Sequence, residues 1–168
     1  MTNRNFRQII NLLDLRWQRR VPVIHQTETA ECGLACLAMI CGHFGKNIDL
    51  IYLRRKFNLS ARGATLAGIN GIAEQLGMAT RALSLELDEL RVLKTPCILH
   101  WDFSHFVVLV SVKRNRYVLH DPARGIRYIS REEMSRYFTG VALEVWPGSE
   151  FQSETLQTRI SLRSLINS

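Results

Sequence analysis

The chain turns from polar to apolar within the stretch Gln26-Thr-Glu-Thr-Ala-Glu-Cys32-Gly-Leu-Ala-Cys-Leu. The polar part is typical of a turn, and the apolar part continues at helical density as far as Phe44. We therefore predict a helix from about Ala30 to Phe44 with Cys32 in its first turn. The free N–H groups and the positive dipole end of such a turn favour a thiolate over a thiol. Cys32 is accordingly a candidate nucleophile.

Around this stretch the pattern predicts a helical half followed by strands. The other expected helices are Asp49 to Phe57 and Leu66 to Leu76, followed by a short helical turn at 86–93 and a helix opened by the capping box Ser130–Glu133. The expected strands are Met78 to Leu85, Cys97 to Trp101, Phe106 to Val112, Tyr117 to His120 and Val141 to Trp146. The predicted fold class is α+β, with the N-terminal helical half packed on a C-terminal antiparallel sheet.

The composition is that of one globular domain. The chain has 168 residues, of which 46% are hydrophobic and 22% are charged. No apolar run approaches the roughly 18–20 residues of a membrane span, and Arg16, Arg19 and Arg20 interrupt any signal-peptide core. The cytosol is the default compartment, so the four cysteines are expected to be thiols.

The net charge of +7 is unevenly distributed. The first 20 residues hold five Arg against one Asp, and further basic clusters lie at Arg54-Arg55-Lys56 and at 113–116. Such a surface suits an acidic peptide or anionic lipid, while ordinary solvated faces explain the charge about equally well. No zinc-finger, RNA-binding or helix-turn-helix signature accompanies the charge, so we expect no nucleic-acid partner.

Three segments are expected along the chain. Residues 1–20 form an amphipathic basic segment, in which apolar residues recur at helical spacing from Phe6 to Trp17. Residues 21–148 form the domain proper. Residues 149–168 are polar and are interpreted as a linker towards a transmembrane domain that this chain does not contain.

Candidate catalytic residues fall where the two halves should meet. His105 stands just before the clearest strand, and Asp121 follows the partner strand of the same hairpin. A cysteine at a helix start facing a histidine on a sheet can form a thiolate–imidazolium pair. A carboxylate on the next strand can hold the imidazole Nδ1–H and turn Nε2 towards sulfur. The side-chain amide of Gln26 is available to join the Cys32 backbone N–H in stabilising an oxyanion.

Each of these residues alone has an ordinary explanation, and other assignments are open. A lone Cys is usually a small core residue, and His100 or His120 could replace His105 as the base. A zinc site from Cys32, Cys36, Cys41 and His43 is disfavoured because a helix turns Cys41 away from the first two thiols. A catalytic site is favoured because all of these candidate residues occur together, in this order along the chain.

The motifs resemble those of the C39 peptidases, the papain-like N-terminal domains of bacterial ABC transporters that export bacteriocins. The resemblance rests on His25-Gln26, on Glu31-Cys32-Gly-Leu-Ala-Cys-Leu, on His105-Phe-Val-Val-Leu and on Asp121-Pro. It covers roughly residues 21–147. One departure is Glu31, where the family usually shows Asp before the cysteine.

The resemblance implies a function and the roles of four residues. Cys32 would be the nucleophile, His105 the general base and acid, Asp121 the orienting residue and Gln26 the oxyanion donor. The substrate would be a bacteriocin precursor, cut after a leader peptide that ends in Gly-Gly, with no cofactor and no metal. The partners would be the transmembrane and nucleotide-binding domains of the same exporter, as a homodimer on the cytoplasmic side of the inner membrane. The alternative is a non-catalytic C39-like domain that binds and tethers export cargo.

Overall fold

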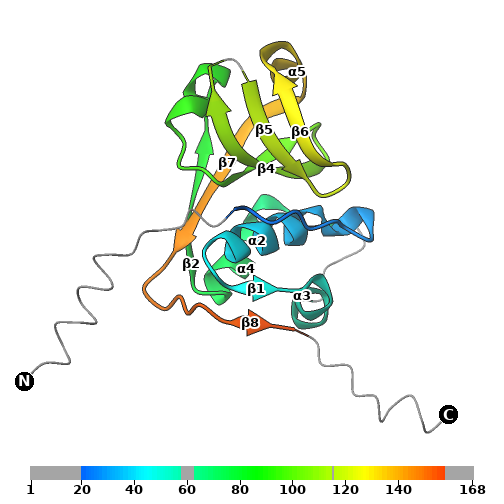
Figure 1. Ribbon diagram of the computed structural model, residues 1–168, viewed down its shortest axis with the longest axis vertical. Helices are drawn as coiled ribbons and strands as arrows, with labels where there is room; N and C mark the ends of the chain where they lie inside the picture. Colours follow the sequence, from blue (N-terminus) through cyan, green and yellow to red (C-terminus); the bar gives the residue numbers. More distant parts are fainter. Residues whose placement is uncertain (1–19, 58–62, 115, 158–168) are drawn as a thin grey trace, which may run out of the picture.

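The computed structural model describes residues 20–57, 63–114 and 116–157 and divides them into two halves (Figure 1). The helical half contains η1 (Thr29–Glu31), α2 (Cys32–His43), β1 (Asn47–Ile48), α3 (Leu50–Phe57) and α4 (Leu66–Gln75). The sheet half contains β2 (Met78–Ser84), η2 (Leu87–Val92), β3 (Cys97–Trp101), β4 (His105–Lys113), β5 (Arg116–Asp121), β6 (Gly125–Ser130), α5 (Arg131–Tyr137) and β7 (Phe138–Pro147). β8 (Thr155–Leu156) returns to the helical half. The amphipathic helix predicted within residues 1–20 lies outside the described residues, apart from Arg20.

The large sheet has the strand order β2-β7-β3-β4-β5-β6, and all its neighbours pair antiparallel. In Figure 1 the long strands β2 and β7 run from the sheet down to the helices and join the two halves. The predicted α+β class with an antiparallel sheet is therefore confirmed.

Local signals in the sequence explain where several elements begin and end. The Thr65 hydroxyl caps α4 by accepting a hydrogen bond from the Gly68 N–H, and the Ser130 hydroxyl caps α5 in the same way from Glu133. Gly77 has a φ of 80°, which suits the residue that ends α4 and turns the chain into β2. The helix predicted from about Ala30 starts two residues later, because Thr29–Glu31 form a 3₁₀ turn first.

Three strands were not predicted, and one of them, β1, is only two residues long. β6 is an edge strand in which exposed Ile126 and Tyr128 alternate with less exposed neighbours, and it pairs only with β5. β8 lies in the polar segment that was predicted to be a linker, and it pairs in parallel with β1. The chain therefore packs against the helical half as far as Leu156.

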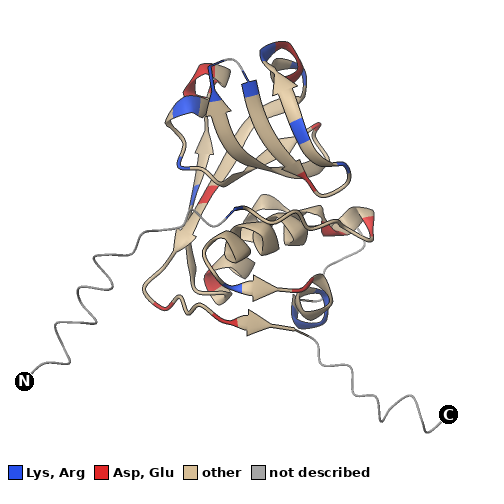
Figure 2. Cartoon of the chain, in the orientation of Figure 1, with Lys and Arg blue, Asp and Glu red and all other residues tan. Residues whose placement is uncertain are grey.

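The core has two parts, one on each face of the sheet. Val108 on β4 belongs to the cluster around α2, whereas its neighbour Val107 belongs to the cluster on the opposite face. Every residue of α2 from Cys32 to Cys41 is buried, and the helix has no Lys, Arg, Asp or Glu (Figure 2). A helix enclosed on all sides needs no polar face. Among the described residues, no helix is long and apolar enough to cross a membrane.

Candidate active site

Cys32 is the first residue of α2 and is only 4% exposed. The prediction that this thiol lies at a helix start is therefore correct. α2 packs against β4, so the helix start is held against the sheet. This seam between the halves is where the candidate site lies.

His105 and Asp121 lie together at one end of a hairpin. His105 is the first residue of β4, Asp121 is the last residue of β5, and the two strands pair antiparallel. The His105 Nε2 atom is 2.8 Å from Asp121 Oδ1. The hairpin geometry expected from the sequence thus brings this pair into hydrogen-bond contact.

The ring orientation of His105 differs from the prediction. We expected Nδ1 to face the carboxylate and Nε2 to face the sulfur, whereas Nε2 bonds Asp121. The Cys32 side chain also raises the pKa of His105, so the thiol lies near the imidazole, and Nδ1 is the ring nitrogen that Asp121 leaves available to it. Strand order places a histidine near a carboxylate, but only the packed backbone decides which ring nitrogen meets it.

The contacts of His105 favour its charged form. Burial would lower the pKa of the imidazole, but the hydrogen bonds to Asp121 and Cys32 and the negative charge of Asp121 raise it to about 9. Burial would likewise raise the pKa of Asp121, but bonds from His105 and from the Ala123 N–H, with the charges of His105 and Arg127, hold it below its usual range. An imidazolium beside a carboxylate is therefore the resting arrangement at neutral pH.

Arg127 is a member of the site that the sequence argument missed. Its Nη1 is 3.4 Å from Asp121 Oδ2, its Nη2 is 2.5 Å from Glu133 Oε1, and its guanidinium lies 5.9 Å from the Trp101 ring centroid. It therefore contacts the oxygen of Asp121 that His105 leaves unused. Because β6 was not predicted, nothing in the sequence indicated that Arg127 faces Asp121.

Gln26 is tied to the site through its backbone. Its N–H donates to the Pro122 carbonyl at 3.0 Å, directly beside Asp121. Its side-chain oxygen is buried without a hydrogen-bond partner among the described residues. This oxygen can only accept a hydrogen bond, so the proposed oxyanion donor of Gln26 is the NH₂ group of the same amide.

The rival histidines and thiols have other surroundings. The Nδ1 atoms of His100 and His120 contact Thr139 Oγ1 at 2.9 Å and the Pro22 carbonyl at 3.3 Å. The remaining thiols, Cys36, Cys41 and Cys97, are buried and free, and burial raises the pKa of each one, that of Cys41 to about 12. Within the described ranges, no group of three or more His, Cys, Asp or Glu side chains is arranged to hold a metal ion.

Trp101 pairs with His105 across the β3–β4 hairpin, and His25 directly precedes Gln26. Trp101 is 4% exposed and stacks on Tyr137 at 5.5 Å, so it is a core residue rather than a cleft wall. His25 is exposed, and its ring approaches Gly125, where a Cβ would lie 3.5 Å from it. No reaction role follows from that position.

Comparison with known proteins places this geometry in a family. The family model described as "Peptidase C39 family" matches residues 20–150. The chain is 89% identical over 168 residues to the probable microcin-H47 secretion/processing ATP-binding protein MchF of Escherichia coli, and it spans 24% of that relative's length.

Two solved structures resemble the fold closely. A double glycine motif protease from an AMS/PCAT transporter, solved in complex with the leader peptide, matches with a TM-score of 0.73 and 36% identity over 79% of this chain and 96% of that one. The peptidase domain of Streptococcus ComA matches with a TM-score of 0.70 and 28% identity over 76% of this chain and 99% of that one. The predicted papain-like fold class is confirmed by these neighbours. The chain belongs to the peptidase C39 family of cysteine peptidases.

Proposed function

We propose that the chain is an endopeptidase domain that removes a Gly-Gly-terminated leader peptide from a bacteriocin precursor. The observation that supports this most is the placement of His105 between the Cys32 thiol and the buried Asp121 carboxylate. The description of the structural relative as a double glycine motif protease, bound to a leader peptide, gives the substrate class.

The proposed reaction uses His105 twice. The Cys32 thiolate, paired with the His105 imidazolium, attacks the carbonyl carbon of the second glycine. The Asp121 carboxylate stabilises the imidazolium, while the Gln26 amide and the Cys32 backbone N–H stabilise the oxyanion. The imidazolium then protonates the departing amine, which leaves a thioester between Cys32 and the leader. The neutral His105 then deprotonates water, which hydrolyses this thioester, frees the leader's carboxyl group and restores the Cys32 thiolate beside the imidazolium.

The larger assembly is part of the same proposal. MchF is described as a secretion/processing ATP-binding protein, and this chain spans 24% of it. We infer that transmembrane and nucleotide-binding domains of one exporter accompany the peptidase, as a homodimer with this domain on the cytoplasmic side of the inner membrane. Cleavage would then be coupled to export.

A cleavage assay tests the activity. We expect the domain to cut a synthetic precursor after its second glycine, with the products identified by mass spectrometry. Cys32→Ala should abolish the cut and leave the circular dichroism spectrum unchanged, because alanine fits the space of the thiol. Cys97→Ala is the matched control and should cost stability rather than activity.

Two outcomes would contradict the proposal. If the wild-type domain binds the precursor without cutting it, the cargo-tethering alternative is correct. If an alkylating reagent inactivates the domain through Cys41 or Cys97 and leaves Cys32 unmodified, the nucleophile is misassigned.

A further inference from the structure

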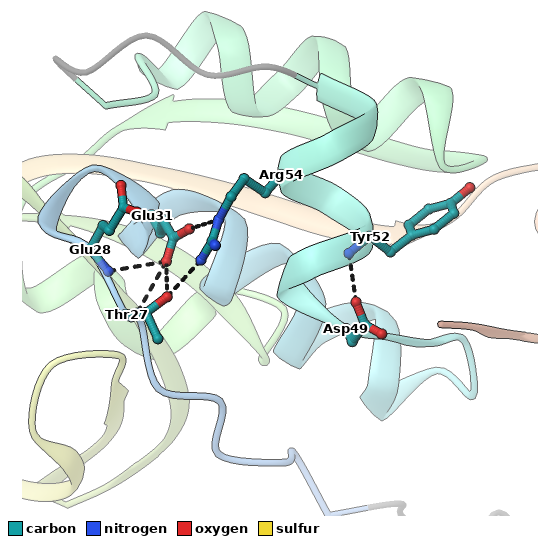
Figure 3. A network of polar contacts seen from close by, with 6 residues as sticks. All are labelled: Thr27, Glu28, Glu31, Asp49, Tyr52 and Arg54. Atoms are coloured by element: carbon teal, nitrogen blue, oxygen red, sulfur yellow. Dashed lines mark hydrogen bonds and ion pairs between the residues drawn. The ribbon is translucent and has the colours of Figure 1, made fainter. Parts of the chain in front are cut away.

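Glu31 immediately precedes Cys32 and is a buried acid, only 4% exposed. Figure 3 shows its carboxylate facing the turn at Thr27 and Glu28 on one side and Arg54 of α3 on the other. In the sequence, Glu31 stands out only because the family usually has Asp at this position. The structure gives its carboxylate a full set of partners.

Both carboxylate oxygens of Glu31 are used. Oε2 accepts hydrogen bonds from the Thr27 N–H at 3.0 Å, the Thr27 hydroxyl at 2.7 Å and the Glu28 N–H at 3.1 Å. Oε1 accepts from Arg54 Nε at 2.5 Å, and Arg54 Nη2 donates to the Thr27 hydroxyl at 2.7 Å. These contacts close a ring of three side chains, Glu31, Thr27 and Arg54, which we call the clamp.

The clamp acts on the segment that contains Gln26. Thr27 follows Gln26 directly, and on the other side the Gln26 N–H is held by the Pro122 carbonyl at 3.0 Å. The backbone at Gln26 is therefore held on two sides. Glu31, the residue before Cys32, binds Thr27, and Pro122, the residue after Asp121, binds the Gln26 N–H. Each proposed oxyanion donor therefore adjoins a member of the clamp. Gln26 is followed by Thr27, and Cys32 is preceded by Glu31.

Charge on Glu31 is what holds the clamp together. A carboxylate accepts at both oxygens, whereas an amide of the same shape accepts at one and donates at the other. Burial alone would raise the pKa of Glu31, but bonds from Arg54, Thr27 and Glu28 lower it to about 2. The carboxylate is thus ionised throughout the neutral range.

We propose that Glu31, together with Arg54, is a positioning residue that sets the Gln26 amide at the oxyanion site beside Cys32. The inference rests on the proposed function and extends it by two residues. It also assigns Arg54 to the clamp, so this arginine is not a free charge of the basic cluster 54–56.

A double-mutant cycle tests the proposal with Glu31→Gln, Gln26→Ala and their combination, all measured on a Gly-Gly precursor. Removing an oxyanion donor costs on the order of 10²–10³ in kcat, so a displaced donor should cost about tenfold or more, with little change in KM. In the Gln26→Ala background, Glu31→Gln should have almost no further effect on kcat, because the donor it positions is already gone.

Arg54→Gln is the second arm and does not depend on a buried substitution, since Arg54 is 43% exposed. It should lower kcat in the same direction, and its loss should likewise vanish in the Gln26→Ala background. Arg55→Gln, the exposed neighbour on α3, is the matched control and should retain the wild-type kcat.

The possible failures are distinguishable. A wild-type domain that cuts, with kcat losses that multiply in the double variants, shows that Glu31 acts independently of Gln26 and overturns this inference alone. A rise in KM at constant kcat in Arg54→Gln means that Arg54 binds substrate directly, and it also overturns the inference. A wild-type domain that does not cut overturns the proposed function and this inference with it.

Discussion

At the level of single residues, buried acids are each paired with an arginine. Glu31 contacts Arg54, Asp121 contacts Arg127, and Glu144 contacts Arg81 at 2.6 Å. A buried charge without a partner is costly, so a carboxylate in a core needs a cation or several hydrogen-bond donors. In the C39 fold of this chain, two of these three pairs lie beside proposed catalytic residues.

The charge on His105 predicts the basic limb of the pH profile. The pKa of about 9 means that the imidazolium, which must protonate the leaving amine, is present below that pH and lost above it. We expect kcat/KM to fall as the pH rises through about 9. In Asp121→Asn the bond and charge that raise this pKa are weakened, so the limb should move to lower pH and the maximal rate should drop.

The measurement is kcat/KM against pH for wild type, Asp121→Asn and Asp88→Asn. Asp88 is an exposed acid on η2, bonded to Arg131, so its variant should keep the wild-type profile. If kcat/KM of Asp121→Asn falls at the same pH as that of the wild type, Asp121 does not raise the pKa of His105. The same pKa makes a stability prediction: the contribution of His105 is complete below about 6.5 and disappears as the pH rises through about 9.

At the level of elements, the segment after β7 is part of the domain's packing. Lys46, at the end of the turn into β1, is 5% exposed; its Nζ donates to the Leu76 carbonyl at 2.8 Å and lies 3.2 Å from Glu154 Oε1. The same Nζ lies 5.1 Å from the ring centroid of Phe151. These contacts and the pairing of β8 with β1 fix the strand that leads into α3.

Phe151→Ala should therefore destabilise the helical half. Because Phe151 is half-buried, we expect a loss of about 1–3 kcal/mol in the free energy of unfolding, less than for a fully buried phenylalanine. The measurement is chemical denaturation monitored by circular dichroism, with the exposed neighbour Gln152→Ala as the control. An unchanged midpoint in Phe151→Ala would mean that residues 149–157 act as a linker despite their contacts.

At the level of the whole molecule, one sheet separates two cores and only one of them touches the nucleophile. The α2 side contains Cys32 and Val108, while the other side contains Val107 and Trp101. The seam must hold the start of α2 against the start of β4, since Cys32 and His105 come from different halves.

Val108→Ala and Val107→Ala separate packing from positioning. Both valines are fully buried neighbours on β4, so each truncation should cost about 1–3 kcal/mol of stability. Val108→Ala should in addition lower kcat, because it weakens the packing of α2 on β4 that holds Cys32 near His105. Val107→Ala should leave kcat near the wild-type value. Equal kcat values in the two variants would show that the seam tolerates such a change.

Features that depend on local signals and chain order could be predicted from the sequence alone. Hydrophobic period and short-range hydrogen bonds predict the helix with Cys32 in its first turn, the hairpin that joins His105 to Asp121 and the cap at Ser130. Such signals act within a few residues, so they can be recognised without knowledge of the tertiary fold.

Contacts between distant segments could not be predicted in this way and are known from the packed fold. The ring nitrogen that faces Asp121, the position of Arg127, the bond from Arg54 to Glu31 and the pairing of β8 with β1 all depend on how packed elements meet. A two-residue strand or a single arginine has no periodicity to recognise. The contacts that stabilise such a strand or arginine are made with residues far away in the sequence, and they form only when the two halves pack together.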